Sequence, residues 1–206
     1  MNEEEVKSIL LDKLNFSQDS IYKIDVFCRE VIEYNKKFNL IAKSTIETVW
    51  DRHVLDSAQL VKFIEFNDGL SLSDLGTGAG FPGIIIAIFN KNPKFHVKLY
   101  EKSRVKIKFL TGICKKLNIN AEVYENDIFS HEIQSTYVVS RAFKKLEEHL
   151  RISREIIKKS HKLIILKGRN AEEEIKKVNK NFNYTYSLKN SITSPDSKII
   201  ILEIKK

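Results

Sequence analysis

The sequence is poor in the features that would place this protein outside the cell or in a membrane. Its 206 residues include two cysteines, Cys28 and Cys114, which are too few and too far apart for a disulfide framework or a metal cluster. No stretch approaches the roughly 18 consecutive apolar residues of a membrane-spanning helix. Residues 1–5 are acidic, unlike a signal or transit peptide. We therefore expect a cytoplasmic protein that holds no metal and does not bind a membrane.

The chain also lacks internal repeats and low-complexity segments, and its length suits one domain with an added segment. Apolar residues recur at helical spacing in three early segments, namely 3–14, 18–38 and 45–64. Asn67-Asp68-Gly69 then forms a strong breaker, after which the pattern changes. We expect a helical lead-in over residues 1–66 that packs on a catalytic domain over residues 67–206.

Acidic residues are fewer than basic ones, with 27 Asp and Glu against 35 Lys and Arg, so the net charge is +8. A basic balance favours polyanionic partners such as nucleic acid. The alternative is a lysine-rich composition with no such role, because many of the lysines are scattered along the chain.

Glycine is scarce, but four of the seven glycines fall within eight residues, at Gly76, Gly78, Gly80 and Gly83. An alternating segment precedes them and an apolar run follows, which predicts a strand, a tight turn and a helix. Glycine permits positive φ and lets a ligand approach the main chain. Pro82 suits the first position of the helix. We expect the N–H groups of the turn and the helix start to face a polar ligand.

Two nucleotide-binding templates fit this spacing. Gly76-x-Gly78-x-Gly80 is the nucleoside loop of S-adenosylmethionine methyltransferases, and Gly78-x-Gly80-x-x-Gly83 satisfies the dinucleotide fingerprint. Both templates need an acidic residue at the end of the next strand to hold a ribose, and Glu101 stands at about that distance. A glycine-rich turn without a ligand is the third interpretation.

Strand-like and helix-like runs alternate after residue 69. The strand-like runs are 70–75, 96–101, 121–125, 136–140, 162–167, 182–188 and 198–204, and the helical ones are 83–89, 105–117, 146–157 and 171–178. This alternation predicts an α/β fold with an open, mostly parallel sheet. The last two runs have a turn at 194–197 and no helix between them, which indicates an antiparallel hairpin. The arrangement is that of the Rossmann-like class I S-adenosylmethionine methyltransferase sheet, whereas a dinucleotide enzyme more often adds a sixth parallel strand.

Ligands of open sheets bind at the carboxyl ends of the strands. The residues expected to line one crevice there are Asp74, Gly76, Glu101, Asn126, Asp127, Arg141, Lys167 and Gly168. With S-adenosylmethionine as cofactor, Glu101 would hold the ribose, Asn126 and Asp127 the adenine, and Gly76 and Gly78 the methionine end. Phe81 would pack against the cofactor, and Arg141 with Lys167 would orient the substrate. Methyl transfer is an in-line displacement that depends on alignment, so we predict no catalytic base.

Two further groups of residues need an interpretation. Arg52-His53-x-x-Asp56-Ser57 places three polar groups on one helix, which cannot converge as a hydrolase triad. Its role stays open between a helix surface that contacts the sheet and a functional contact. Lys102, Arg104, Lys106 and Lys108 follow Glu101 and form either a solvated helix face or a phosphate contact.

The longest motifs resemble the bacterial small-subunit ribosomal RNA guanine-N7 methyltransferases, the RsmG (GidB) family. The resemblance rests on the motifs at 34–40, 52–57, 74–83, 109–110, 140–142 and 166–168, together with Glu101. The glycine loop extended by Phe81-Pro82-Gly83, together with the upstream Arg-His-x-x-Asp-Ser block, is specific to this family. Val105 departs from the pattern, because the family commonly has a basic residue there, and Ile128 stands where a second acid is frequent.

The resemblance implies an S-adenosylmethionine-dependent enzyme that methylates N7 of one guanine in 16S ribosomal RNA. By motif, the cofactor contacts carry over to Gly76, Phe81, Asn126, Asp127 and Arg141, with Glu101 assigned by its strand-end position. The expected RNA-binding residues are Arg52, His53, Lys102, Arg104, Lys106 and Lys167. Guanine N7 carries a free lone pair in a deep groove, so the target must be exposed or displaced from its stack. We expect a monomer that acts on ribosomal RNA or a ribosomal subunit. The alternatives are a dinucleotide-dependent oxidoreductase and a non-catalytic RNA-binding or assembly factor.

Overall fold

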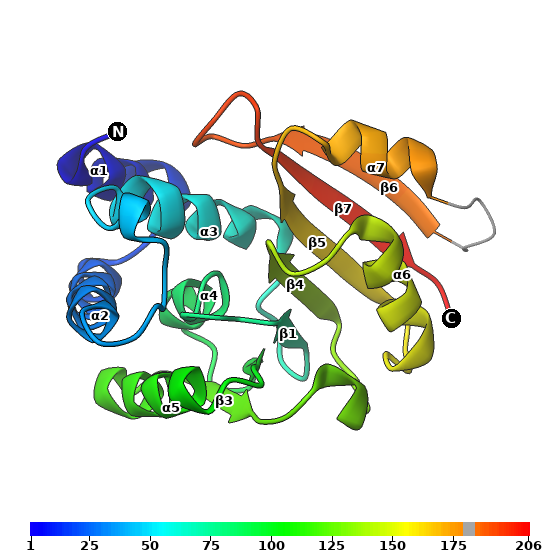
Figure 1. Ribbon diagram of the computed structural model, residues 1–206, viewed down its shortest axis with the longest axis horizontal. Coiled ribbons are helices and arrows are strands. Elements are labelled where there is room, and N and C mark those ends of the chain that lie inside the picture. Colours follow the sequence, from blue (N-terminus) through cyan, green and yellow to red (C-terminus); the bar gives the residue numbers. More distant parts are fainter. Residues whose placement is uncertain (179–183) are drawn as a thin grey trace.

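A seven-stranded mixed sheet forms the centre of the molecule in the computed structural model, which describes residues 1–178 and 184–206 (Figure 1). The strand order is β3-β2-β1-β4-β5-β7-β6. Neighbouring strands from β3 to β5 are parallel, and β7 runs antiparallel to both β5 and β6. The strands are β1 (Ser71–Leu75), β2 (His96–Tyr100), β3 (Ala121–Tyr124), β4 (Tyr137–Arg141), β5 (His161–Lys167), β6 (Tyr184–Asn190) and β7 (Lys198–Ile204).

This arrangement confirms the predicted fold class, including the C-terminal antiparallel hairpin. Most strand bounds agree with the expected ones to within one or two residues. The expected start of the sixth strand, at residues 182 and 183, lies outside the described part of the chain.

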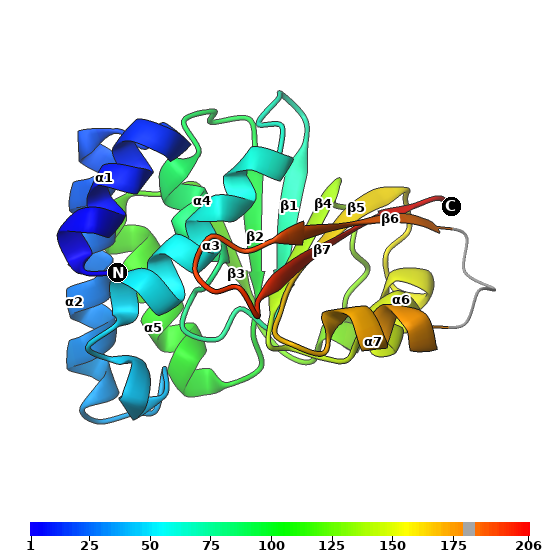
Figure 2. The same cartoon turned by 90° about the horizontal axis from the view of Figure 1, so that it is seen from above.

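Helices cover both faces of the sheet (Figure 2). The regular helices are α1 (Glu3–Leu14), α2 (Gln18–Asn35), α4 (Gly83–Phe89), α5 (Arg104–Leu117), α6 (Leu146–Glu155) and α7 (Ala171–Lys177). Apolar residues of α1, α2, α4 and α5 form one core on one face, and those of α6 and α7 form a second core on the other. Each strand contributes side chains to both cores, because successive residues of a strand point to opposite faces of the sheet. Val139 and Ile164 belong to the first core, and their neighbours Val138 and Leu163 belong to the second. None of the described helices is long and apolar enough to cross a bilayer.

The lead-in helices begin where the sequence predicts, but the second ends early. The side chain of Asn2 accepts the N–H of Glu5, and that of Ser17 accepts the N–H of Ser20, as N-caps do. Helix α2 stops at Asn35 and not at residue 38. The Asn35 side-chain oxygen accepts the backbone N–H groups of Leu40 (2.7 Å) and Ile41 (3.0 Å), which turns the chain out of the helix.

The third expected helix, over residues 45–64, is a continuous helical segment over residues 50–63, whose hydrogen-bond pattern changes along its length (Figure 1). It consists of a π-helical turn η2 (Trp50–Leu55), one α-turn α3 (Asp56–Ala58) and a 3₁₀ turn η3 (Gln59–Phe63), and a separate 3₁₀ turn η1 (Lys43–Thr45) precedes it. Part of the cause is local, because the Ser57 hydroxyl donates to the His53 carbonyl at 2.6 Å. A π-turn is often found at functional sites, and this one lies beside the glycine loop.

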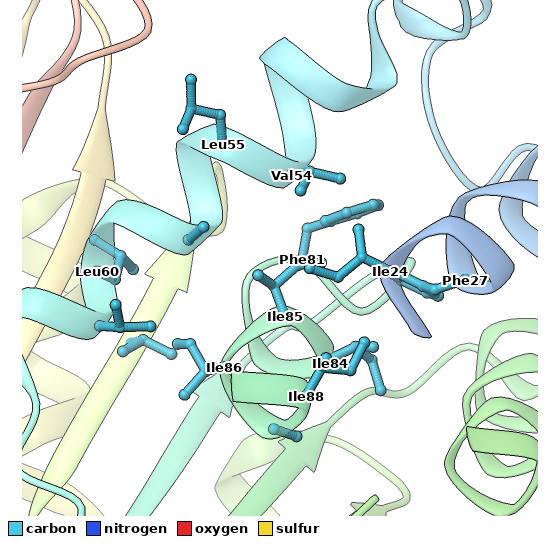
Figure 3. Close-up of a cluster of buried hydrophobic side chains, with 14 of the residues drawn as sticks. Ile24, Phe27, Val54, Leu55, Leu60, Phe81, Ile84, Ile85, Ile86 and Ile88 are labelled. Atoms are coloured by element: carbon cyan, nitrogen blue, oxygen red, sulfur yellow. The ribbon is translucent and has the colours of Figure 1, made fainter. Parts of the chain in front are cut away.

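The lead-in packs on the sheet through a layer of aromatic and branched side chains. Phe81 of the glycine loop lies beside Ile24 and Phe27 of α2 and Val54 of η2 (Figure 3). The Phe27 ring centroid is 5.0 Å from that of Phe81 and 6.4 Å from that of Phe109 in α5. Because all of these side chains belong to one core, the lead-in and the glycine loop hold each other in place.

Candidate active site

The glycine loop joins β1 to α4 and forms a main-chain cradle. Gly76, Gly78 and Gly80 have φ of 67°, 63° and 102°, in the region that favours glycine. The Thr77 N–H donates to the Tyr100 carbonyl at 3.0 Å, which ties the loop to β2. A Cβ on Gly78 would meet only Gly76 O, at 3.9 Å, so the space beside this residue is open to a ligand.

Asp74 does not line the crevice, so this part of the expectation is wrong. Its side chain is fully buried, and its Oδ2 accepts the Thr77 hydroxyl (2.6 Å) and the Gly83 N–H (2.8 Å). The start of α4 is therefore satisfied internally and does not face a ligand. Pro82 is the N-cap of this helix and not its first residue. Burial raises the pKa of Asp74 to about 6, because the charged carboxylate loses its hydration.

Two hollows meet at the loop. The larger, which we call the site cavity, has a volume of about 530 Å³ and lies between the carboxyl ends of β1, β4 and β5 and the lead-in. Among its lining residues are Gly76, Gly78, Phe81, Arg141, Arg52, His53 and Lys167. The smaller, which we call the rim hollow, has a volume of about 220 Å³ and is lined in part by Glu101, Asn126, Asp127, Lys102 and Phe143. Both hollows include Gly76, Gly78 and Lys106, so they flank one stretch of main chain.

Glu101 is held firmly at the boundary with the rim hollow. One carboxylate oxygen accepts the Gly78 N–H at 3.0 Å, and the other accepts the N–H groups of Lys102 and Ser103, both at 2.9 Å. The carboxylate thus joins the glycine loop to the start of α5. Asn126 and Asp127 are exposed at the end of β3, and Asn126 has a positive φ of 79°. The structure therefore brings together the three side chains expected to hold an adenosine.

Arg141 is the centre of the site cavity's polar network. Its Nη2 donates to His53 Nδ1 at 2.7 Å and its Nη1 to the Arg52 carbonyl at 3.1 Å. The Asp56 carboxylate lies 3.9 Å from Nη1, and the guanidinium carbon lies 5.3 Å from the centre of the Phe81 ring. Four partners thus fix the guanidinium in one orientation.

His53 is neutral in this arrangement. Its Nε2 lies 2.8 Å from Thr45 Oγ1, and that hydroxyl donates to the Ala42 carbonyl at 2.8 Å. The hydroxyl therefore accepts from Nε2–H, while Nδ1 accepts from Arg141. Burial, together with the nearby Arg141 and Arg52, lowers the pKa of His53 to about 3. His53 thus acts on the guanidinium as a hydrogen-bond acceptor.

Asp56 and Gln59 connect the lead-in to the loop between β6 and β7. Gln59 donates to Ser191 Oγ at 2.9 Å and accepts the Ile192 N–H at 3.0 Å. The Thr193 hydroxyl donates to Asp56 at 3.1 Å. Motif spacing missed Thr45, Gln59 and these loop residues, because their partners lie up to 137 positions away in the sequence. Ser57 is fully buried and bonded to the helix backbone, so the block is not a hydrolase triad.

The expected basic residues divide into three groups. Arg52 and Lys106 line the site cavity, and Lys102 lines the rim hollow with Lys106. Lys167 also lines the site cavity, but its ammonium is paired with Glu174 at 2.8 Å and donates to the Lys144 carbonyl at 2.6 Å. Arg104 lines neither hollow and faces a groove between α2 and α5. The described residues hold no group of His, Cys, Asp and Glu suited to a metal ion.

Comparisons with known proteins place this chain among ribosomal RNA methyltransferases. The family model of rRNA small subunit methyltransferase G matches residues 20–200. Ribosomal RNA small subunit methyltransferase G of Pelagibacter ubique is 37% identical over 202 residues, which cover 96% of this chain and 93% of the relative. The protein of the same name from Rickettsia felis is 34% identical over 89% of this chain and 93% of the relative.

Solved structures resemble the fold at low sequence identity. A SAM dependent methyltransferase from Aquifex aeolicus has a TM-score of 0.59 at 14% identity and covers 84% of this chain and 97% of its own. P. horikoshii TYW2 in complex with MeSAdo has a TM-score of 0.53 at 17% identity and covers 73% of this chain and 61% of its own. At this level of identity, the likeness establishes the arrangement of the sheet and helices.

Proposed function

The chain belongs to the rRNA small subunit methyltransferase G family, and from this premise we propose that it methylates N7 of a specific guanine in small-subunit ribosomal RNA. The donor is S-adenosylmethionine, which supplies a methyl group on a positively charged sulfur when bound. The observation that carries the proposal is the position of the glycine loop between two hollows. One hollow offers the residues that hold an adenosine, and the other offers a fixed cation and space for a base.

The residues present fit this cofactor. Gly78 lines both hollows, and because it has no side chain a ligand can approach its backbone. Gly76 has the positive φ that the turn requires. The Glu101 carboxylate is oriented by three backbone N–H groups and still has lone pairs for ribose hydroxyls. Asn126 and Asp127 stand next to it at the rim hollow for the adenine. Phe81 packs under Arg141 and closes the cradle from the lead-in side.

Arg141 orients the acceptor base in the site cavity. Guanine N7 already carries its lone pair, so the chain supplies alignment and excludes water, and no side chain must remove a proton. Guanine O6 lies next to N7 and also accepts hydrogen bonds, so an arginine donor at O6 orients the base and leaves the N7 lone pair free for the methyl group. Because His53, Arg52, Asp56 and Phe81 already hold the guanidinium, it needs little reordering when the base enters.

Arg52, Lys102 and Lys106 are the proposed phosphate contacts around the two hollows. His53 is neutral and hydrogen-bonded at both ring nitrogens, so we assign it to positioning Arg141 and not to RNA. Lys167 supports the loop after β4 through its bond to the Lys144 carbonyl. We propose that residues 1–66 form the lead-in and residues 67–206 the methyltransferase domain, and that the protein acts as a cytoplasmic monomer.

The alternatives find no comparable support. A dinucleotide enzyme of the doubly wound class has a sheet of six parallel strands, whereas β7 here lies antiparallel between β5 and β6. A factor without catalysis would not need the open main chain at Gly78 or the oriented Glu101 carboxylate.

The test is methyl transfer from labelled S-adenosylmethionine to small ribosomal subunits of a strain that lacks the gene. We expect labelled rRNA with the modification at one guanine N7, which chemical cleavage at N7-methylguanine maps. Subunits from the parent strain serve as the control, because their target is already methylated. Labelling of protein alone, or equal labelling of both kinds of subunit, would overturn the proposal.

A further inference from the structure

The motif at residues 34–40, Tyr-Asn-Lys-Lys-Phe-Asn-Leu, contributes to more than the site cavity. Leu40 is buried and lines that cavity with Ile41. Phe38, only two residues earlier, is 40% exposed at the surface. The Asn35 side chain fixes both positions, because it holds the N–H groups of Leu40 and Ile41 and so sets the turn that carries Phe38 outward.

Phe38 lies in a groove between the end of α2 and the start of α5, which we call the Phe38 groove. It has a volume of about 640 Å³ and is lined by Tyr34, Lys37, Phe38, Arg104, Val105 and Lys108, with Glu30 and Glu33 at one side. The Phe38 and Tyr34 ring centroids are 4.9 Å apart, and Tyr34 packs in turn on Phe109 of the core at 5.0 Å. Val105 is 37% exposed. The groove therefore presents an apolar floor anchored in the core.

The charges around this floor are not balanced. Glu30 is paired with Lys116 at 2.6 Å, and Glu33 is paired with Lys36 at 2.5 Å. Lys37, Arg104 and Lys108, by contrast, form no ion pair with any residue of the described chain. Arg104 and Lys108 are four residues apart on α5 and so share one side of this helix. Three cations are thus available to an anionic partner at the groove.

The Phe38 groove and the site cavity are linked by the chain itself, because residues 38 to 41 run from one to the other. On α5, Arg104 and Lys108 line the groove, and Lys106, between them in the sequence, lies on the other side of the helix and lines the site cavity. A polynucleotide with one base in the site cavity would therefore reach the groove with its neighbouring nucleotides.

We propose that the Phe38 groove binds an unpaired stretch of the substrate RNA next to the methylated nucleotide. One base stacks on Phe38, and the adjoining phosphates contact Lys37, Arg104 and Lys108. Exposed aromatic rings beside unpaired cations are the means by which proteins hold single-stranded nucleic acid. This inference rests on the proposed function, since it assigns a second contact to the same RNA. It also explains how the enzyme keeps the target nucleotide outside a regular helix, because the groove holds the neighbours in a single-stranded form.

A photocrosslink tests the position of the RNA. Phe38 is replaced by photoreactive benzoylphenylalanine, the variant is bound to small subunits from the strain without the gene, and the crosslinked partner is identified by primer extension and mass spectrometry. We expect a crosslink to rRNA within a few nucleotides of the methylated guanine. A crosslink to a ribosomal protein, or to RNA remote from that guanine, would overturn the inference while methyl transfer by the wild-type protein would still support the proposed function.

Substitutions test whether the contact matters. Phe38→Ala should weaken binding to the unmethylated RNA by roughly 5- to 100-fold, as for loss of one stacked base, while S-adenosylmethionine affinity stays unchanged. Tyr22→Ala is the matched control, because Tyr22 is an aromatic residue of α2 that is 68% exposed and lies outside the groove.

The combined variant Lys37→Ala/Arg104→Ala/Lys108→Ala tests the cations. It should reduce the slope of log affinity against log salt by about two, at roughly 0.7 for each lost single-strand contact. Lys91→Ala should leave the slope unchanged, because Lys91 lies in the loop before β2, whereas α5 and the groove follow the carboxyl end of that strand. Wild-type binding and methylation with no change in the Phe38 and cation variants would reject the groove and leave the proposed function intact. Wild-type protein that neither binds nor methylates the RNA would reject both.

Discussion

The two hollows beside the glycine loop are built in different ways. In the rim hollow, Glu101 accepts from Gly78, Lys102 and Ser103, which all belong to the glycine loop and the next strand end. In the site cavity, Arg141 donates to Arg52 and His53, which precede it by 89 and 88 residues. The contacts that orient Glu101 at the rim hollow thus come from the glycine loop and the end of β2. The contacts that orient Arg141 in the site cavity depend instead on the packing of the lead-in against the sheet.

The exposure of the two groups differs accordingly. Asn126 and Asp127 are exposed, whereas the side chains of Arg141 and Asp56 are 19% and 16% exposed. Substitutions at the rim hollow should therefore affect cofactor binding with little effect on folding. Substitutions in the Arg141 network should affect both folding and methyl transfer.

Arg141→Ala should have the largest effect. It leaves Asp56 without its cation and His53 without its donor, at a cost of about 3–5 kcal/mol in the free energy of unfolding. Loss of the oriented guanidinium should also lower kcat/KM for methyl transfer roughly 100-fold. Urea unfolding and labelled methyl transfer measure the two effects. Arg151→Ala, on α6, is the control, and equal effects in both variants would contradict the role of the network.

Gly83→Ala should destabilise the junction of the glycine loop and α4, which lies behind both hollows. A Cβ there would lie 2.3 Å from Leu99 and 2.7 Å from Asp74 Oδ2, inside the core. We expect a loss of about 3 kcal/mol on thermal or urea unfolding. Gly112→Ala on α5 is the matched control, because its Cβ would meet nothing within 4 Å and alanine favours helix by about 0.5–1 kcal/mol. A stable Gly83→Ala protein would show that the loop packs differently.

Acid should weaken the Arg141 network through His53. Its folded-state pKa is lowered from 6.5 to about 3, so the unfolded state binds more protons between these values and stability falls as the pH drops below 6.5. His53 alone should remove about 2 kcal/mol between pH 7 and pH 5. Urea unfolding of the wild type and of His53→Gln at both pH values isolates this contribution as the difference between their pH dependences.

Asp74 and His149 also contribute to the pH dependence of stability, in the wild type and in His53→Gln alike. The pKa of Asp74 is raised to about 6, so its unfavourable contribution shrinks as the pH falls from 6 toward 4. Burial lowers the pKa of His149 to about 4, which acts in the same direction as His53. Both residues are unchanged in His53→Gln. An identical pH dependence of wild type and variant would therefore contradict a buried, neutral His53.

Glu101→Gln should weaken cofactor binding at the rim hollow more than it weakens the fold. The amide has one acceptor oxygen in place of two and carries no charge, so S-adenosylmethionine affinity should fall about tenfold. The free energy of unfolding should fall by about 1–2 kcal/mol, because the amide N–H2 must face either the Gly78 N–H or the N–H groups of Lys102 and Ser103. Calorimetric titration and urea unfolding give both values, with Glu172→Gln on exposed α7 as the control. A variant with full affinity would remove Glu101 from the cofactor site.

Gln59→Ala should have the smallest effect. It removes the bonds to Ser191 and the Ile192 N–H that connect the lead-in with the β6–β7 loop. We expect about 1 kcal/mol of lost stability and faster hydrogen exchange over residues 191–197. Lys62→Ala, exposed on the same 3₁₀ turn, should change neither. Unaltered exchange in Gln59→Ala would show that the loop is held by other contacts.

The sequence predicts the site best where the pattern is local. The spacing of Gly76, Gly78 and Gly80 and the distance to Glu101 predict the cradle, because a tight turn after a strand leaves few other conformations for that stretch. The strand-end rule brings Asn126 and Asp127 to the same place. The strand-end rule was wrong for Asp74. A side chain near the end of a buried strand can also bond to the loop that follows, and the Asp74 carboxylate accepts from Thr77 and Gly83.

The sequence by itself therefore determined the α/β class, the glycine cradle and the acid beside it, because each follows from periodicity and turn residues that are local in the sequence. Only the tertiary structure decided that His53 serves Arg141, that Asp56 and Gln59 hold the hairpin loop, and that Phe38 faces outward beside unpaired cations. These contacts join segments up to 137 residues apart. Their geometry follows from how the lead-in packs on Phe81 and α4, and that packing depends on side-chain shape, which periodicity does not encode.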